Sequence, residues 1–159
     1  TYQPQPYGDL VSQHRAGESH FYRYDALGST TALTDSAGNV TDEARYFAFG
    51  AEATSSGTTE TPYRWLGRVG YRRDESTGLS YVRARHYDPA VGRFVSPDPL
   101  GLDAGDENLY RYVGNDPVGK RDPSGMAPDG ELHDDGRTVV IRNTSCEPTK
   151  VFVGDRLNQ

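Results

Sequence analysis

Short runs of aromatic and β-branched residues alternate with turn-forming residues along the first half of the chain. Residues 21–24, 30–34 and 44–49 form such runs, and Gly, Asp, Asn or Ser separates each run from the next. Runs of about five residues with turns at roughly ten-residue spacing are typical of hairpins joined in a β-meander. Alternate residues of a strand share a face, so Tyr22 and Tyr24 are predicted to lie together.

The pattern is less regular beyond residue 50. Residues 51–62 are polar and predict a flexible loop between hairpins. Residues 79–86 predict one strand, and residues 92–96 predict a second, shorter one. Asp106 stands in an N-cap position, so residues 107–113 predict a short helical turn.

Tyrosine is the main large side chain available for a core. The chain has 11 Tyr and 5 Phe but only 34% hydrophobic residues, against about 45–50% in ordinary globular domains, a figure that also counts Gly. This balance, with 18 Gly and 10 Pro, is compatible with disorder, but disordered chains are poor in aromatic residues. We therefore expect an all-β protein with a thin core packed by tyrosine.

Charge and apolar patterning narrow the function classes. The net charge of −6 argues against a nucleic-acid partner, although residues 63–93 carry seven Arg against three acidic residues. No apolar run approaches the roughly 18–20 residues of a membrane span, and no signal peptide is visible. The chain begins with Thr1, which suggests a fragment of a longer protein.

No cofactor or metal is expected. Cys146 is the single cysteine, so an internal disulfide and a cysteine-based zinc site are both excluded. The four histidines do not have the spacing of metal ligands; they are His14, His20, His86 and His133.

Asp-Pro steps occur four times, at Asp88, Asp98, Asp116 and Asp122. Asp accepts a backbone N–H and Pro fixes φ, so the pair is common in turns, and a turn role explains Asp88 and Asp116. Asp98 and Asp122 both stand in the pattern Asp-Pro-x-Gly. These two are the candidates for chemistry.

The composition changes after residue 126. Tyrosine is frequent before that position and absent from residues 127–159. Residues 137–143 and 150–155 predict two strands of a hairpin. The tail is short for an independent domain. It is the start of a longer effector, a degenerate stub or a linker tail, and the sequence leaves these three open.

Several segments together resemble the rearrangement hotspot (Rhs) or YD-repeat family. They are "YDALGSTTALTDSAGNV", "YRWLGR", "TGLSYVRARHYDPAVGRFVSPDPLGL" and "NLYRYVGNDPVGKRDPSG". The resemblance covers residues 22–126 and is to the family's C-terminal core segment. It implies a β-ribbon that spirals into a hollow shell, with an inward-curling C-terminal plug. It also implies three parts: the end of an upstream repeat region (1–19), the core (20–126) and a variable C-terminal tail (127–159).

The resemblance implies a function and partners as well. Family members include polymorphic toxins delivered by secretion systems, C subunits of insecticidal toxin complexes and wall-associated proteins. The segment after the core varies and is often a toxin held inside the shell. The expected partners are therefore the upstream shell of the same chain, the tail as cargo, and a toxin-delivery or secretion component. The expected location is bacterial, secreted or at the cell surface.

Family members often cut themselves at the border between core and tail. Asp98 and Asp122 match the family's two proposed catalytic aspartates. Two close carboxylates do not both ionise cheaply, so one acts as a base on water while the other holds a proton and polarises the scissile carbonyl. The cut is expected one apolar residue after Asp-Pro-x-Gly, between Met126 and Ala127. The result would be a single-turnover autoprotease of aspartyl type.

An arginine near such a pair could position a carboxylate or stabilise the developing oxyanion. Arg85 fits the family's arginine, and Arg83 is the alternative because alternate strand residues share a face. The competing interpretation is a structural ion pair at Arg85. In that case the chain is a non-catalytic structural, cell-surface adhesion or carbohydrate-binding YD-repeat module.

Overall fold

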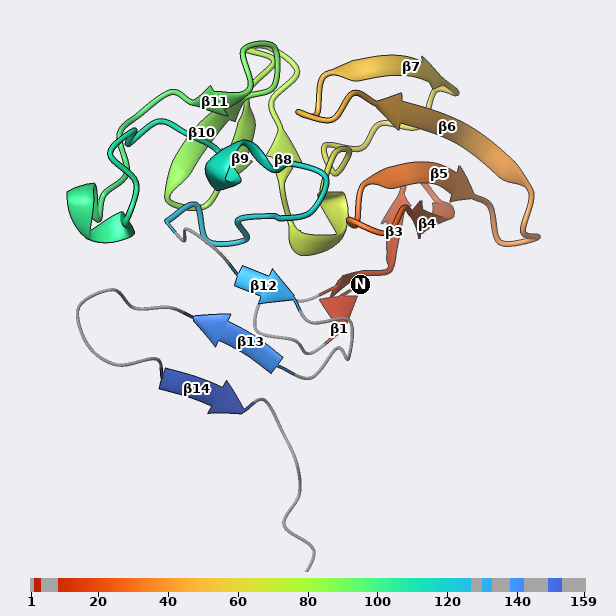
Figure 1. Cartoon of the computed structure of the whole chain (residues 1–159). Coiled ribbons are helices and arrows are strands. Elements are labelled where there is room, and N and C mark those ends of the chain that lie inside the picture. The colour runs from red at the N-terminus through yellow and green to blue at the C-terminus, as the bar shows by residue number, and fades with distance from the viewer. Residues whose placement is uncertain (1, 4–8, 127–129, 133–137, 142–148, 153–159) are drawn as a thin grey trace, which may run out of the picture.

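The computed structural model describes residues 2–3, 9–126, 130–132, 138–141 and 149–152. These residues form antiparallel strands joined by turns, with three short 3-10 helices and no longer helix (Figure 1). None of these helices has the length or apolar character of a membrane span. The expected all-β class is confirmed.

The first half of the chain forms a five-stranded antiparallel sheet in the order β3-β4-β5-β6-β7. Each strand pairs with the next in sequence, so the expected hairpin meander is confirmed. The strands are β3 (Ser12–Arg15), β4 (Glu18–Tyr24), β5 (Thr30–Thr34), β6 (Val40–Tyr46) and β7 (Glu52–Ser56). Position 20, where the expected core begins, lies inside β4.

The second half forms a four-stranded antiparallel sheet in the order β11-β10-β9-β8. Its strands are β8 (Arg72–Arg73), β9 (Ser80–Val82), β10 (Arg85–Asp88) and β11 (Arg93–Phe94). The 3-10 helices η1 (Gly67–Val69), η2 (Gly101–Ala104) and η3 (Val113–Asn115) lie in the segments around it.

Two small sheets complete the described chain. The first pairs β1 (Tyr2–Gln3) with β2 (Asp9–Leu10). The second holds β12 (Gly130–Leu132), β13 (Thr138–Ile141) and β14 (Thr149–Phe152). Antiparallel pairing of β13 with β14 confirms the hairpin expected in the tail.

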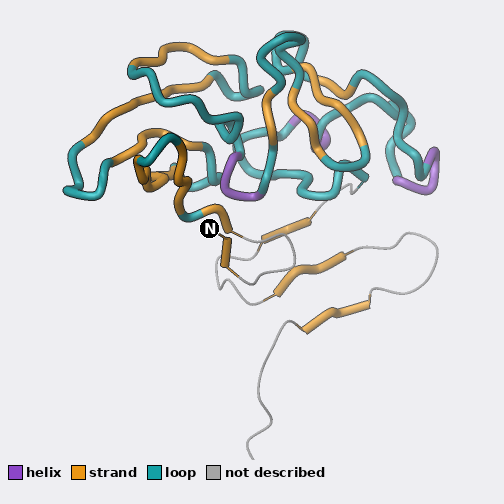
Figure 2. The backbone as a smooth tube through the Cα atoms, turned by 180° about the vertical axis from the view of Figure 1, so that it is seen from behind, coloured by secondary structure: helices purple, strands orange, loops and turns teal. Residues whose placement is uncertain are grey.

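The two larger sheets lie side by side, as the front and back views show (Figure 1, Figure 2). Main-chain hydrogen bonds join them through the segment between β7 and β8. The Thr30 N–H donates to the carbonyl of Arg64 at 2.9 Å, and the Arg73 N–H donates to the carbonyl of Pro62 at 2.8 Å. The segment that follows η3 returns to the first sheet, where Arg121 donates to the carbonyl of Leu27 at 3.0 Å.

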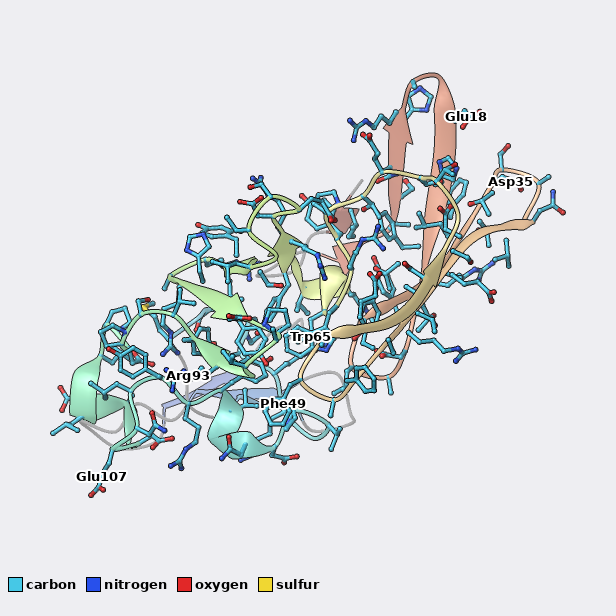
Figure 3. The ribbon with its side chains drawn as sticks, turned by 90° about the horizontal axis from the view of Figure 1, so that it is seen from above. Glu18, Asp35, Phe49, Trp65, Arg93 and Glu107 are labelled. Atoms are coloured by element: carbon cyan, nitrogen blue, oxygen red, sulfur yellow. The ribbon has the colours of Figure 1, made fainter. Side chains whose placement is uncertain are left out.

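Aromatic rings fill the larger core, as the tyrosine content predicts. Trp65 lies between the two sheets (Figure 3), and its ring centroid is 5.1 Å from that of Tyr87 and 5.5 Å from that of Tyr112. The buried cluster comprises Trp65, Leu66, Val69, Tyr71, Val82, Tyr87, Phe94, Tyr112 and Val113. Gly50 has to be glycine, because a Cβ there would overlap the Trp65 ring and its φ is +88°.

A smaller buried cluster comprises Tyr22 and Leu33 of the first sheet and Leu10 of β2. The Tyr22 ring stacks on that of Tyr24 with centroids 6.0 Å apart, which confirms that these two side chains share a face. The Tyr22 hydroxyl hydrogen-bonds the Thr61 hydroxyl at 2.6 Å, so this cluster anchors the connection to the second sheet.

Two expected elements differ in the structure. The predicted loop at 51–62 begins with a strand, β7, because the polar residues there pair as an edge strand with β6. The helical turn expected near 107–113 is displaced: the 3-10 helix η3 begins only at Val113 and ends at Asn115. The Asp106 carboxylate instead accepts the Asn108 N–H at 2.8 Å, a local turn that competes with helix.

The prediction of a single strand at 79–86 is wrong, because this segment is a tight hairpin. β9 ends at Val82, β10 begins at Arg85, and these two residues face each other across a two-residue turn. Arg83 has a left-handed φ of 46°, which residues other than Gly, Asn and Asp rarely adopt. No glycine marks this turn, so the run looks like one continuous strand.

Candidate active site

The three expected site residues reach one place from three separate segments. Arg85 is the first residue of β10, directly after the β9–β10 turn. Asp98 lies between β11 and η2, and Asp122 lies after η3. All three side chains are buried: the exposed fractions are 4% for Arg85, 9% for Asp98 and 1% for Asp122.

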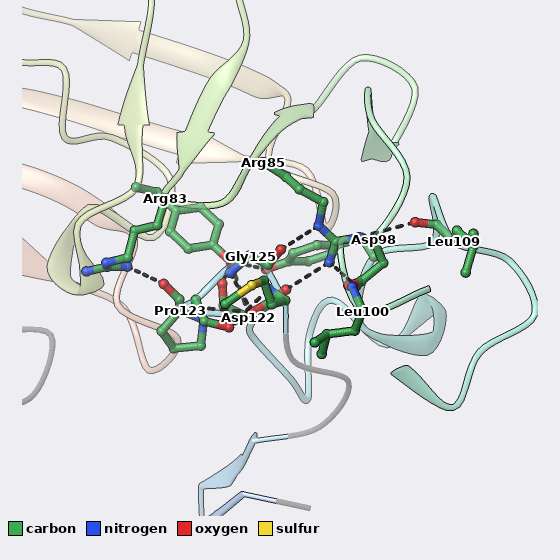
Figure 4. Close-up of polar contacts among 12 residues, drawn as sticks. Arg83, Arg85, Asp98, Leu100, Leu109, Asp122, Pro123 and Gly125 are labelled. Atoms are coloured by element: carbon green, nitrogen blue, oxygen red, sulfur yellow. Dashed lines mark hydrogen bonds and ion pairs between the residues drawn. The ribbon is translucent and has the colours of Figure 1, made fainter. Parts of the chain in front are cut away.

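The Arg85 guanidinium connects the two carboxylates (Figure 4). One nitrogen, Nη2, lies 2.8 Å from Asp98 Oδ2 and 3.3 Å from Asp122 Oδ2. The other two nitrogens donate to carbonyl oxygens, Nη1 to Leu109 at 3.2 Å and Nε to Gly125 at 2.5 Å. A single cation thus faces two carboxylates and the main chain of the segment before the expected cut.

An aromatic ring covers one face of the guanidinium. The Arg85 Cζ atom lies 3.5 Å from the centroid of the Phe94 ring, a cation–π contact that is stronger in a desolvated site. Burial lowers the pKa of Arg85, and the carboxylates of Asp98 and Asp122 oppose that shift by favouring the charged form. Arginine is not deprotonated in proteins, so the site holds a fixed positive charge.

Each aspartate uses its second oxygen to hold a turn, as the Asp-Pro pattern predicts. Asp98 Oδ1 accepts the Leu100 N–H at 2.9 Å. Asp122 Oδ1 accepts the N–H groups of Ser124 and Gly125, at 3.2 and 2.8 Å, and the Ser124 hydroxyl at 3.0 Å. Each carboxylate therefore has one oxygen fixed by its own turn and one oxygen directed at Arg85.

Asp116 shows that the motif alone does not define the site. It also stands in the pattern Asp-Pro-x-Gly, with Gly119 as the glycine. Asp116 is exposed to solvent, and its Oδ1 accepts the Gly119 N–H at 3.1 Å. The turn role expected for Asp116 is therefore confirmed, and burial beside Arg85 is what separates Asp98 and Asp122 from it.

Tyr71 holds the backbone of Asp122. Its hydroxyl donates to the Asp122 carbonyl at 2.6 Å, accepts the Asp122 N–H at 3.2 Å and contacts the Tyr112 hydroxyl at 3.1 Å. Burial raises the pKa of the Tyr71 hydroxyl well above its ordinary value, so it stays protonated. The aromatic core therefore fixes the position of one of the two carboxylates.

The segment after Asp122 lies across the β9–β10 turn. Arg83 donates to the carbonyls of Pro123 and, at 2.9 Å, Val69, while the Ala84 N–H donates to the Ser124 carbonyl at 3.3 Å. These acceptors of Arg83 are main-chain oxygens, whereas Arg85 makes the carboxylate contacts expected of the family's arginine.

The expected cleavage site lies at the edge of the described chain. Met126 follows the carbonyl that Arg85 holds, and its N–H donates to the Ser124 hydroxyl at 3.0 Å. Its exposed fraction is 37%, so the side chain is partly open to solvent. Ala127 lies outside the described residues.

Sequence patterns do not reveal the groups that support this site. Tyr71, Phe94 and the Leu109 carbonyl come from segments with no chemical motif. Their contacts are to main chain or to a ring face, which leave no characteristic pair of residue types in the sequence. The aromatic content of the chain is the one signal that points toward them.

Such an arrangement has the components of an aspartyl-type hydrolytic site. Two carboxylates can divide the roles of acid and base, and a fixed cation beside a peptide carbonyl can stabilise negative charge on oxygen. Burial strengthens each of these interactions relative to water.

Comparison with known proteins finds relatives among toxins. The chain is 42% identical over 123 residues to double-stranded DNA deaminase toxin A of Burkholderia cenocepacia, covering 74% of this chain and 8% of the relative. It is 37% identical over 121 residues to the tRNA3(Ser)-specific nuclease WapA of Bacillus spizizenii, covering 74% and 5%. The chain thus spans less than a tenth of the length of these relatives.

Solved structures agree with the sequence comparisons. The crystal structure of TcdB2-TccC3 superposes with a TM-score of 0.63 at 31% identity, covering 72% of this chain and 6% of that one. The family described as the teneurin YD-shell matches residues 5–118, well over half of the chain. The chain therefore belongs to the YD-shell family, the family of the Rhs and YD-repeat proteins.

Proposed function

We propose that this chain is the C-terminal core of an Rhs/YD-repeat toxin and cleaves its own backbone between Met126 and Ala127. One observation carries the proposal: Arg85 bridges Asp98 and Asp122 in a buried site that also holds the carbonyl of Gly125. The residue just before Met126 is therefore bound to Arg85 and to Asp122.

The chemistry would be a hydrolysis. One carboxylate takes a proton from water, and the water oxygen bonds to the carbonyl carbon of Met126. The second carboxyl group keeps its proton and hydrogen-bonds the carbonyl oxygen, and the positive charge of Arg85 helps to stabilise the negative charge that develops on that oxygen. The C–N bond then breaks, and the Ala127 nitrogen takes the proton that the first carboxylate removed from water. The products are a carboxyl terminus at Met126 and an amino terminus at Ala127.

Differences among the relatives support a division between shell and cargo. Relatives named as a DNA deaminase toxin and as a tRNA nuclease are similar to this chain over comparable lengths. Because their named activities differ, the shared part is not what determines activity. We infer that residues 20–126 are shell core and that the variable, toxic activity of such proteins belongs to the segment after the cut.

The same family membership supports the proposed partners and location. The core would pack against the upstream YD-repeat shell of its own chain, and the tail would be its cargo. Relatives include toxin subunit YenC2 of Yersinia entomophaga. We therefore propose a bacterial protein that is secreted or lies at the cell surface, with a toxin-delivery or secretion component as partner.

Substitution of the site aspartates tests the proposal. Asp98→Asn and Asp122→Asn keep the shape of the side chain but remove its acid–base function, and each should abolish cleavage. Asp116→Asn is the matched control, because Asp116 shares the Asp-Pro-x-Gly pattern but is exposed and accepts a turn N–H from Gly119. It should cleave at the wild-type rate.

The readout is the fraction of cleaved chain in purified protein, measured by mass spectrometry. Cleavage that continues in both site variants would exclude the aspartyl mechanism. A wild-type chain that stays whole would favour the structural interpretation, in which Arg85 is only a buried ion pair.

A further inference from the structure

The β9–β10 hairpin binds three consecutive carbonyl groups of the segment before the expected cut. The Arg83 side chain binds that of Pro123, the Ala84 N–H binds that of Ser124, and Arg85 Nε binds that of Gly125. Three consecutive residues, the two of the turn and the first of β10, thus match three consecutive residues of the segment. Figure 4 shows the two arginine contacts at the ends of this series.

Two of these contacts have evident roles. Arg85 belongs to the carboxylate site, and the Ala84 N–H is a main-chain donor that any residue except proline would supply. Arg83 has neither role, yet it keeps a left-handed φ of 46°, a conformation that is unfavourable for a residue with a side chain. Strain of this kind persists where surrounding contacts require it.

In this conformation the Arg83 guanidinium binds two main-chain carbonyls. Its Nη1 donates to the Pro123 carbonyl and its Nη2 donates to the Val69 carbonyl at 2.9 Å. Val69 belongs to η1 and to the buried aromatic cluster. Arg83 thereby connects residues 123–126, here called the cleavage segment, to the core. This connection is separate from the bridge between Arg85 and the two aspartates.

These hydrogen bonds recognise the main chain of residues 123–125. All three acceptors are carbonyl oxygens, so the side chains of Pro123 and Ser124 are not selected by these bonds. What three matched bonds do fix is register, because a slip by one residue would place every carbonyl against the wrong donor. Bonds to main-chain carbonyls position a segment without selecting its side chains.

We propose that Arg83 is a positioning residue that sets the register of residues 123–126 and thereby selects which peptide bond is cut. This rests on the proposed self-cleavage. The Pro123 and Val69 carbonyls that Arg83 binds lie outside the bridge between Arg85 and the two aspartates, so we expect its removal to leave the acid–base behaviour of the carboxylates intact. Its loss should change the rate and the precision of cleavage and leave the pH profile unchanged.

Arg83→Met tests this directly, because methionine keeps an apolar stem and removes the donors. We expect cleavage to slow at least tenfold and to yield more than one fragment boundary, with the wild-type pH dependence. Arg83→Lys restores one donor and should recover part of the rate and the single boundary. Arg72→Met, an exposed arginine on β8 of the same sheet, should cleave as wild type.

A second readout does not depend on cleavage. Hydrogen exchange is measured on the uncleaved Asp98→Asn protein with and without Arg83→Met. The Ala84 and Gly125 amides, which donate to Ser124 and to Asp122, should exchange at least tenfold faster in the double variant. The Leu33 amide of β5 should be unaffected, which shows that the fold is retained.

The two readouts separate the two proposals. If the wild type does not cleave but Arg83→Met accelerates exchange, the self-cleavage proposal fails and Arg83 acts only as a clamp. If Arg83→Met cleaves at the single wild-type bond and rate, or if exchange at Ala84 and Gly125 does not change, Arg83 does not set the register.

Discussion

At the residue scale, Gly125 joins the cleavage segment to the site by having no side chain. Its φ is +72°, and a Cβ there would overlap the Val82 carbonyl oxygen and lie 3.2 Å from the N atoms of Ala84 and Arg85. The neighbouring atoms are main chain of the β9–β10 hairpin and cannot move aside without breaking it. The glycine of this Asp-Pro-x-Gly motif thus allows close approach of two backbones.

Gly125→Ala should abolish self-cleavage while the rest of the fold remains. Its matched control is Gly78→Ala, because Gly78 has φ +73° but nothing within 4 Å of the position that an added methyl group would take. That variant should lose only the cost of the left-handed conformation, about 1–2 kcal/mol, and should still cleave. Mass spectrometry reports cleavage and thermal unfolding reports stability. Normal cleavage by Gly125→Ala would show that the segment is not docked as described.

The residue scale is also where the sequence is most informative. The Asp-Pro-x-Gly motif and the family match point to Asp98 and Asp122, and the family match points to Arg85. The structure brings these three together. Tyr71 is not predictable in this way, because its hydroxyl serves the main chain of Asp122 and no residue-type pairing records that contact.

At the scale of elements, the Asp42 carboxylate of β6 binds the segment that connects β7 to β8. Asp42 Oδ1 accepts the Thr59 N–H at 2.8 Å, and Oδ2 accepts the hydroxyls of Thr59 and Thr41 at 2.6 and 2.7 Å. Burial raises the pKa of Asp42, but these hydrogen bonds outweigh it, so the net pKa lies below the ordinary value. The ionised form is therefore the one that the fold favours.

Asp42→Ala should destabilise the first sheet by about 1–3 kcal/mol at pH 7, the usual cost of losing hydrogen bonds to a charged group. Because the folded pKa is depressed, the stabilisation is present above the unfolded value of about 4 and declines as pH falls below it. Denaturant unfolding at pH 7 and at pH 3 measures this difference. An equal gap between wild type and variant at both pH values would contradict it.

Elements are best predicted where the turn residues are conventional. The strand expected at 30–34 matches β5, and Asp25 and Gly28 close the preceding turn through the bond from the Gly28 N–H to the Asp25 carboxylate at 2.8 Å. The β9–β10 hairpin is not predictable from local sequence, because tertiary contacts of Arg83 stabilise its turn. Nothing in the local sequence signals a bond to a residue forty positions later.

At the scale of the whole molecule, the chain matches only a small part of much longer relatives, whose named activities differ from one another. Its described core is a curved pair of sheets whose last segment, 121–126, returns to contact both. The family resemblance predicts this class from the sequence. The meeting of residues 85, 98 and 122 requires the structure, because only the tertiary fold bridges their separation along the chain.

The proposed function depends on cleavage of the chain's own backbone at one bond, and the intact mass of the purified wild-type protein measures this cleavage without any variant. Cleavage gives two species whose masses match residues 1–126 and 127–159, with the added mass of one water shared between them. A single species with the mass of the whole chain, under conditions where the protein is folded, would contradict it.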